Sequence, residues 1–158
     1  MFETLRQAKG LIVSKSGNFQ KELATRSLQA AREVRRDSAL RQARTCYDHL
    51  AGVAGVDLLD EMLMHDWLQE DKGPRTLYRL TGIGERALSS RGVDLSGAAA
   101  QRRPFAYGCL DWTERRNHLR GSLSAAILVA LTSSGTVGRK AGTRTVALER
   151  PILDWLKT

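Results

Sequence analysis

Two cysteines and two histidines are the side chains of this sequence that could bind a metal ion or react with an oxidant. Cys46 and His49 lie three positions apart in a segment expected to be helical, and this spacing places both side chains on one helix face. Cys109 and His118 lie nine positions apart, which is no standard spacing of zinc ligands. Two cysteines and two histidines are a permissible zinc set. The sequence therefore predicts no required cofactor, and zinc is the cofactor that these four residues could bind.

Two other interpretations of these residues stay open. In the first, the cysteines are small core residues and the histidines are hydrogen-bonded structural groups, because free cysteine is often buried and Cys46 borders an apolar face. In the second, the cysteines sense oxidants, which requires a lowered thiol pKa such as nearby Arg44 could cause. An oxidant sensor also needs Cys46 and Cys109 to approach one another in the fold.

The cysteines and histidines lie in two similar phrases, which indicates an internal repeat. Each phrase contains Cys-x-Asp and, downstream, His-Leu-x-Gly. A shift of 69 residues aligns His49 with His118 and Gly52 with Gly121. Self-similarity of this kind is typical of duplicated structural units. We therefore predict one unit of helices and a hairpin that is present twice and packed on itself.

Hydrophobic periodicity predicts a mainly α fold with small β-hairpins, built from two tandem winged-helix-like units. Asp37 is expected to cap a helix whose apolar residues run from Leu40 to Ala54, and Asp57 to cap the next helix. The polar stretch 69–75 is expected to be a hairpin turn, and Thr81 to cap a short closing helix. The chain then divides into an N-terminal arm and helical connector (1–36), a first unit (37–92), a linker (93–108) and a second unit (109–158).

The second unit is expected to repeat this plan. Asp111 and Glu114 have the spacing of a capping box, which predicts a helix that starts near Trp112. Ser122 is expected to cap a helix so apolar that it must be buried, and residues 136–148 to form the second hairpin. Aromatic residues are expected to pack in the core between the two halves: Tyr47, Trp67, Phe105, Trp112 and Trp155.

The chain has a net charge of +8, from 25 Lys and Arg against 17 Asp and Glu, which fits a nucleic acid or another polyanion as partner. A basic surface that serves only solubility fits the same charge. The basic residues that are candidates for phosphate contacts are Arg35, Arg36, Arg102, Arg103, Arg115, Arg116, Arg139, Lys140 and Arg144. Such contacts supply affinity without sequence information.

Direct reading of DNA bases and catalysis are both unexpected. The helix in the recognition position of the first unit carries Asp57, Asp60 and Glu61, which phosphate repels, and that of the second unit is apolar. The sequence has no phosphate-binding loop, nucleophile elbow or Cys-His-Asn signature, so we expect no enzyme.

No apolar run is long enough to span a bilayer, and two cysteines do not make a disulfide framework. We therefore expect a cytoplasmic protein with no membrane partner.

Three phrases resemble a known family. The run from Leu40 to Gly52, the phrase Arg102-Arg103-Pro104-Phe105 and the run from Cys109 to Arg116 are similar to the C-terminal region of a subset of ArsR-type bacterial transcription regulators. The resemblance covers roughly residues 25–158. It implies a cytoplasmic homodimer whose N-terminal winged helix-turn-helix binds operator DNA. In that family, DNA binding is often relieved by a metal or another small signal.

Residues 1–36 depart from the family pattern, because they contain no such N-terminal module. We therefore expect DNA to be a partner through a winged helix-turn-helix that is not present in this chain. The family's metal-sensing cysteine motif belongs to that module and is not carried over either. The resemblance implies that the chain is an effector or oligomerisation region, which controls DNA binding indirectly through a signal sensed between the repeats. A stand-alone metal or thiol-redox sensor and a non-specific nucleic-acid binder through the arginines stay open as alternatives.

Overall fold

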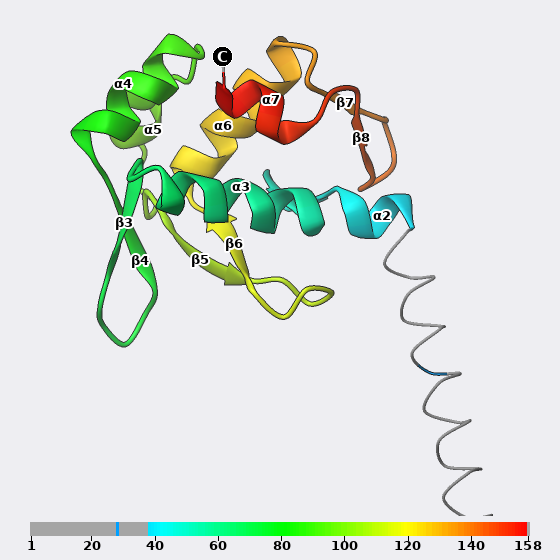
Figure 1. Cartoon of the computed structure of the whole chain (residues 1–158), viewed down its shortest axis with the longest axis horizontal. Helices are drawn as coiled ribbons and strands as arrows, with labels where there is room; N and C mark the ends of the chain where they lie inside the picture. Colours follow the sequence, from blue (N-terminus) through cyan, green and yellow to red (C-terminus); the bar gives the residue numbers. More distant parts are fainter. Residues whose placement is uncertain (1–27, 29–37, 158) are drawn as a thin grey trace, which may run out of the picture. The chain divides into compact units, whose positions relative to one another are not determined.

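The structure is a computed structural model that describes Leu28 and residues 38–157 (Figure 1). Apart from Leu28, the predicted arm and connector lie outside the described residues. So do the candidate phosphate contacts Arg35 and Arg36 and the predicted cap Asp37. The elements below belong to the unit Ser38–Thr158. None of the helices described is long and apolar enough to cross a membrane.

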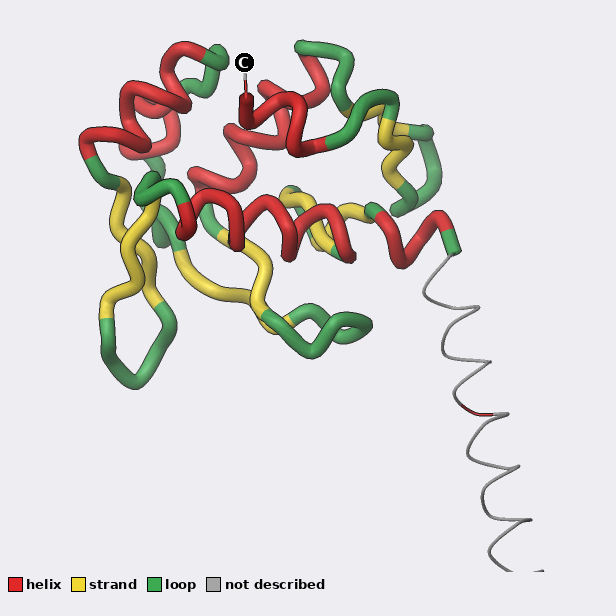
Figure 2. Tube along the Cα trace, in the orientation of Figure 1, coloured by secondary structure: helices red, strands yellow, loops and turns green. Residues whose placement is uncertain are grey.

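Helices and hairpins alternate along the described chain (Figure 2). In order they are α2 (Ala39–Gln42), β1 (Arg44–Cys46), β2 (His49–Ala51), α3 (Val53–Met64), β3 (Leu68–Asp71), β4 (Leu77–Leu80), α4 (Gly82–Ser90), α5 (Leu95–Ala100), β5 (Tyr107–Leu110), β6 (Asn117–Arg120), α6 (Ser122–Ser133), β7 (Val137–Arg139), β8 (Val146–Leu148) and α7 (Ile152–Lys157). The order hairpin, helix, hairpin, helix occurs from β1 to α4 and again from β5 to α7, while α5 lies within the stretch expected to be a linker. A duplicated unit has such an order, although duplication itself stays a prediction.

The strands of the described part form three antiparallel sheets, β1-β2, β3-β4-β5-β6 and β7-β8. In the largest sheet β4 pairs with β5, where Leu77 lies opposite Tyr107, so strands from both halves share one sheet. The fold is therefore mixed α/β, and the prediction of a mainly α fold is wrong. The error arises because two segments with helical periodicity, around Cys46 and after Asp111, form hairpins.

The first of these segments leaves the helical path at Ala43. Helix α2 has its N-cap at Ser38 and ends at Gln42, and Ala43 is extended with φ −155°. The amide of Thr45 donates to the carbonyl of Arg144 at 2.8 Å, and the amide of Val146 donates to the carbonyl of Ala43 at 3.0 Å. These bonds to a segment about one hundred residues away satisfy the backbone as a strand. Local periodicity carries no information about them.

The second segment has the hydrogen bonds of a cap but not the helix. Asp111 Oδ1 accepts from the backbone amides of Thr113 and Glu114 at 3.0 and 3.2 Å, as a helix cap does. The chain then enters the left-handed region at Arg115, with φ 59°, and the amide of Asp111 donates to the carbonyl of Arg116 at 2.8 Å. Aspartate makes the same local bonds in turns, so this spacing does not distinguish a helix from a hairpin.

Glycines mark the two joints between a hairpin and the long helix that follows it. Helix α3 begins after Gly52 rather than at the predicted cap Asp57, and α6 begins after Gly121. Gly52 has φ 80°, and a Cβ there would lie 2.4 Å from the carbonyl oxygen of Arg41. Gly121 has φ 115°, and its Cβ would lie 2.4 Å from the carbonyl oxygen of Phe105. Both joints therefore require glycine, which explains the second half of the repeated phrase.

Local predictions of two hairpins and of one helix cap are confirmed. A hairpin is present where the turn 69–75 was predicted, although residues 69–71 belong to strand β3 and the turn is 72–76, and residues 136–148 contain the hairpin of β7 and β8. Thr81 is the N-cap of α4, and its Oγ1 accepts from the amide of Gly84 at 3.0 Å. These features depend on turn and capping residues next to one another in the chain, so sequence pattern is sufficient to find them.

The core lies around α3 and α6, which both pack against β2 and β6. The most deeply buried apolar side chains on the two helices include Leu58, Leu59, Met62, Leu123, Ile127 and Leu131. Trp67 and Trp155 are buried as predicted, but Tyr47 is 82% exposed and Trp112 is 64% exposed. Their predicted place in the core is wrong, because both belong to hairpin turns rather than to helices.

Candidate metal centre

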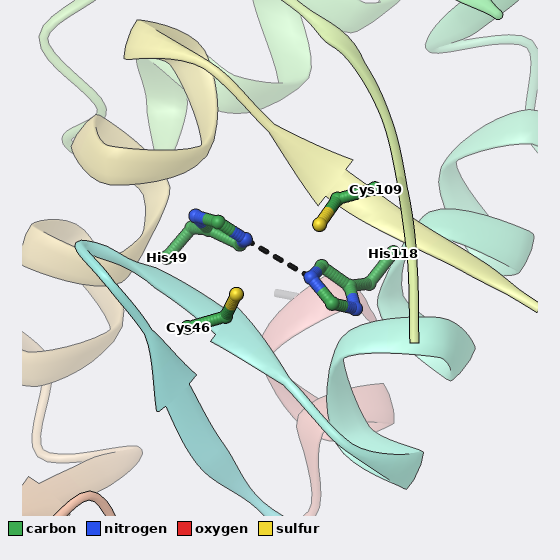
Figure 3. Close-up of side chains that lie close together, drawn as sticks. All are labelled: Cys46, His49, Cys109 and His118. Atoms are coloured by element: carbon green, nitrogen blue, oxygen red, sulfur yellow. Dashed lines mark hydrogen bonds between the residues drawn. The ribbon is translucent and has the colours of Figure 1, made fainter. Parts of the chain in front are cut away.

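Each of two hairpins holds one cysteine opposite one histidine. Cys46 pairs with His49 across β1 and β2, and Cys109 pairs with His118 across β5 and β6. Directly opposite residues of an antiparallel pair project to the same face, so each hairpin presents a Cys–His pair. Figure 3 shows the two pairs facing one another. One possible ligand atom from each residue lies within 4.8 Å of all the others.

The four residues selected from the sequence therefore lie close together in the structure, but in a different secondary structure from the one expected. Cys46 and His49 were expected on a helix face, and the nine-residue spacing of Cys109 and His118 counted against them. In a hairpin both spacings give one cross-strand pair, since the second turn (111–116) is four residues longer than the first (47–48) and the further pair of Leu110 with Asn117 precedes it. The signal that could have revealed this is the match of both pairs to hairpin register rather than to helical spacing.

The size of the cluster fits a tetrahedral ion. An ion with Zn–N bonds of about 2.0 Å and Zn–S bonds of about 2.3 Å separates its ligand atoms by roughly 3.3–3.8 Å. The four candidate ligand atoms lie within 4.8 Å of one another, and the two Nε2 atoms lie 2.9 Å apart. Shifts of about 1 Å or less convert this arrangement into a zinc coordination sphere. Four protein ligands fill such a sphere and leave no position for a substrate.

The two imidazoles are oriented as metal ligands. The Nδ1 atom of His118 lies 3.0 Å from Asp111 Oδ2, and the Nδ1 atom of His49 lies 3.5 Å from Asp48 Oδ1. A carboxylate only accepts, so it favours the tautomer with hydrogen on Nδ1. Both Nε2 atoms then present lone pairs to one another at 2.9 Å. Two lone pairs that face one another repel, and a cation between them, either a proton or a metal ion, removes this repulsion.

His49 also carries a buried polar atom that the protein does not satisfy. His49 is fully buried, and its Nδ1 has no hydrogen-bond partner within the described part of the chain. The contact of 3.5 Å with Asp48 is too long for a strong hydrogen bond. If Nε2 carries the hydrogen, Nδ1 presents a lone pair toward a carboxylate, which is repulsive. A metal ion on Nε2 removes this conflict because the hydrogen then sits on Nδ1.

The electrostatic environment keeps both histidines neutral near pH 7. Burial and the neighbouring His118 lower the pKa of His49 to about 4, although Asp48 opposes the shift. Burial also lowers the pKa of His118, although Asp111 opposes it. Neutral imidazole is the form that binds metals. Neither histidine must therefore lose a charge before it can act as a ligand.

The Cys109 thiol is in the protonated form at neutral pH when no ion is bound. Burial raises the pKa of Cys109, and the neighbouring Cys46 raises it further. A thiol that reacts with oxidants needs a lowered pKa, which the sequence analysis expected from Arg44. Instead, Arg44 forms an ion pair with Asp111 at 2.8 Å. The environment therefore favours metal binding, in which the ion itself displaces the thiol proton, over oxidant sensing.

Asp111 organises the interior of the site. It is completely buried and forms an ion pair with Arg44, which is 1% exposed. Burial alone raises the pKa of Asp111, but hydrogen bonds from Thr113, Gly52 and Arg44 outweigh burial and hold the pKa well below its usual range. The sequence suggested Arg44 only as a neighbour of the cysteines, and the pair with Asp111 was missed. Its members lie 67 residues apart, and no local pattern joins them.

The basic residues predicted to contact phosphate are dispersed among different environments. Arg103 pairs with Asp48 at 2.5 Å, Arg116 pairs with Asp60, and Arg144 donates to the carbonyl of Thr45 at 3.3 Å. The exposed residues of the predicted set in the described region also include Arg102, Arg115, Arg139 and Lys140. Ion pairs thus engage part of the set, and phosphate contact stays a prediction for all of it.

One curated relative is similar to this chain. It is an uncharacterized HTH-type transcriptional regulator, YdfF, of Bacillus subtilis strain 168, with 32% identity over 121 residues. The aligned region covers 77% of this chain and 52% of the relative, so the chain spans about half the length of the relative that it matches. No protein-family model matches the chain. No solved structure matches it either. The relative is named a regulator and not an enzyme, in agreement with the expectation that this chain is not an enzyme.

Proposed function

We propose that this chain is the metal-sensing effector region of an HTH-type transcription regulator of the ArsR type. A zinc-class divalent ion binds to Cys46, His49, Cys109 and His118 and changes DNA binding indirectly. DNA is read by a helix-turn-helix module that we expect outside this chain. As the ArsR resemblance implies, the whole regulator acts as a cytoplasmic homodimer. The similarity to a protein named as an HTH-type regulator supports the regulatory part of this proposal.

One observation carries the metal-binding part. Two imidazole Nε2 atoms face one another at 2.9 Å, with two thiols in the same cluster of 4.8 Å and a carboxylate on the far side of each ring. A set of buried structural histidines has no need of two cysteines at the same point. The combination of soft thiol ligands, imidazoles and outer carboxylates is that of a zinc site.

The effect of the ion follows from where its ligands lie. Cys46 and His49 belong to the first hairpin of the first half, and Cys109 and His118 to the first hairpin of the second half. A bound ion therefore joins the two halves at one point. Each thiol loses its proton to solvent and binds as thiolate, while the neutral imidazoles bind through Nε2. In the whole regulator, this added restraint between hairpins would bias the geometry in which the DNA-reading modules are held.

The long helices support an indirect rather than a direct role in DNA binding. The side of α3 that is not buried carries Asp57, Asp60 and Glu61, which phosphate repels. Helix α6 buries most of its residues and exposes Val129, Thr132 and Ser133, which carry no positive charge. Neither helix offers the cations or amides that base and phosphate contacts require.

The first test is the zinc content of the protein purified without chelators, followed by titration with zinc after removal of any metal. We expect one zinc per chain, and loss of the bound zinc in Cys46→Ser and Cys109→Ser. The matched control is His65→Ala, since His65 is an exposed histidine that pairs with Glu61 and lies outside the cluster. A wild-type chain that takes up no zinc in the titration contradicts the proposal.

A further inference from the structure

We propose that Asp111 is the positioning residue of the metal site and that it links the occupancy of the site to the first turn of α3. The inference rests on the proposed metal binding and assigns a role to residues that bind no metal themselves. Its basis is that one buried carboxylate holds a ligand histidine and the start of a helix at the same oxygen atom.

The Oδ2 atom of Asp111 has two partners. It lies 3.0 Å from Nδ1 of His118 and accepts from the backbone amide of Gly52 at 2.8 Å. Gly52 is the N-cap residue of α3, so its amide belongs to the joint between β2 and this helix. The ligand histidine is in the second half of the chain and the helix is in the first, so Asp111 connects the two halves directly beneath the site.

The Oδ1 atom fixes the carboxylate in place. It accepts from the Arg44 guanidinium at 2.8 Å, from the Thr113 hydroxyl at 2.7 Å and from the Thr113 amide at 3.0 Å. Arg44 is itself held, because it donates to the Thr113 hydroxyl at 3.1 Å and its guanidinium carbon lies 4.7 Å from the centre of the Trp112 ring. A carboxylate with this many donors cannot rotate, so the ring plane of His118 is fixed as well.

The fixed carboxylate prepares His118 for a metal ion. It holds the hydrogen on Nδ1 and leaves the Nε2 lone pair directed into the cluster, which lowers the reorganisation needed for binding. Asp48 orients the ring of His49 less firmly, because their contact is 3.5 Å long, the Asp48 side chain is 32% exposed and Asp48 also pairs with Arg103. Asp111 should therefore affect metal affinity more strongly than Asp48.

The same carboxylate makes α3 sensitive to the ion. A cation on Nε2 draws electron density from the imidazole and makes its Nδ1 hydrogen a stronger donor. The bond from His118 to Oδ2 then strengthens, and the bond that Oδ2 accepts from Gly52 weakens because both donors share one oxygen. Metal binding thus alters the hydrogen bonding of the α3 N-terminus without any contact between the ion and the helix.

The test compares zinc affinities, measured by competition with a chromophoric chelator, in four proteins: wild type, Asp48→Asn, Asp60→Asn and the double variant Arg44→Met with Asp111→Asn. The double variant removes both charges of the buried pair, so that neither is left unpaired and the protein can fold. We expect the double variant to bind zinc about 10- to 100-fold more weakly, and Asp48→Asn less than about 10-fold more weakly. Asp60→Asn, which disrupts the surface pair with Arg116, should match the wild type.

A second measurement separates positioning from a general loss of structure. The amide resonance of Gly52 should shift when zinc binds to the wild type and to Asp48→Asn, and this shift should be lost in the double variant while distant resonances of α7 stay unchanged. A folded double variant with wild-type zinc affinity overturns the positioning role, and an unchanged Gly52 resonance in the wild type overturns the link to α3. A wild type that binds no zinc instead overturns the proposed function and this inference with it.

Discussion

The two histidines of the cluster are supported in opposite ways. His118 lies against Asp111, which is completely buried and held by Arg44 from another strand. His49 lies against Asp48, which is 32% exposed and pairs with an arginine that is 35% exposed. The first arrangement is rigid and the second is adjustable. Under the proposed metal binding, His118 would give the site its fixed geometry, whereas His49 would adjust to the ion.

The largest effect expected on this comparison is the loss of a ligand. Replacing His118 with alanine should weaken zinc binding by about two to three orders of magnitude, because the ion loses one of four ligands and the histidine that a buried carboxylate holds in position. His49→Ala should cost less, since its ring is less firmly held. Competition titrations with zinc measure both affinities. If His49→Ala has the larger effect, the assignment of the rigid ligand is wrong.

The buried and exposed ion pairs should differ strongly in stability. Replacing Arg44 with methionine leaves Asp111 buried without its partner charge, which should lower the free energy of unfolding by about 3–5 kcal/mol. Replacing Arg103 with methionine breaks a half-exposed pair and should cost about 0–1 kcal/mol. Urea denaturation of the metal-free proteins measures both values. Equal losses in the two variants would remove the distinction between a rigid and an adjustable side of the site.

Zinc affinity should depend on pH through the thiols rather than the histidines. Since the pKa of Cys109 is raised, its proton is present at neutral pH without metal and must leave when zinc binds. The pKa of His49 is about 4, so this ring is already neutral above about pH 5. Zinc affinity should therefore rise as the pH rises through the neutral range, by about tenfold per pH unit for each thiol proton that the ion displaces. A slope well above two in a plot of the logarithm of zinc affinity against pH would show that histidine protons are also displaced.

The smallest effect is expected from substitutions in the two hairpin turns. Tyr47 and Arg115 both adopt left-handed backbone conformations, with φ 62° and 59°, which are unfavourable for side chains with a Cβ. Glycine at either position should change the free energy of unfolding by at most about 1 kcal/mol, in the stabilising direction. Zinc affinity should stay unchanged. A large loss of affinity in Tyr47→Gly alone would mean that this exposed side chain takes part in the site.

Local residue chemistry was sufficient to predict several elements of the fold. Thr81 caps α4, and the polar stretch 69–75 lies in a hairpin, because capping and turn residues act on their immediate neighbours. The prediction of a helix around Cys46 was wrong for the opposite reason. Its strand state depends on hydrogen bonds from Thr45 to Arg144 and from Val146 to Ala43, which outweigh a helical pattern of apolar residues.

For the candidate site, the residue types were predictable and the arrangement was not. The repeated phrases contain Cys46, His49, Cys109 and His118, so composition and repetition were enough to select them. Their convergence depends on two hairpins that face one another, which no helical spacing predicts. The buried pair of Arg44 and Asp111 was missed because charged residues are usually exposed, and only the fold provides the partner that makes their burial tolerable.

The most direct test of a four-ligand zinc site is zinc K-edge X-ray absorption spectroscopy of the zinc-loaded chain. We expect a four-coordinate ion with two sulfur ligands at about 2.3 Å and two nitrogen ligands at about 2.0 Å. The Cys109→Ser variant, which is expected to lose the bound zinc, should give no zinc spectrum with two sulfur ligands. A first shell made only of nitrogen and oxygen atoms would contradict the account, because it would place the ion outside the Cys46, His49, Cys109 and His118 cluster.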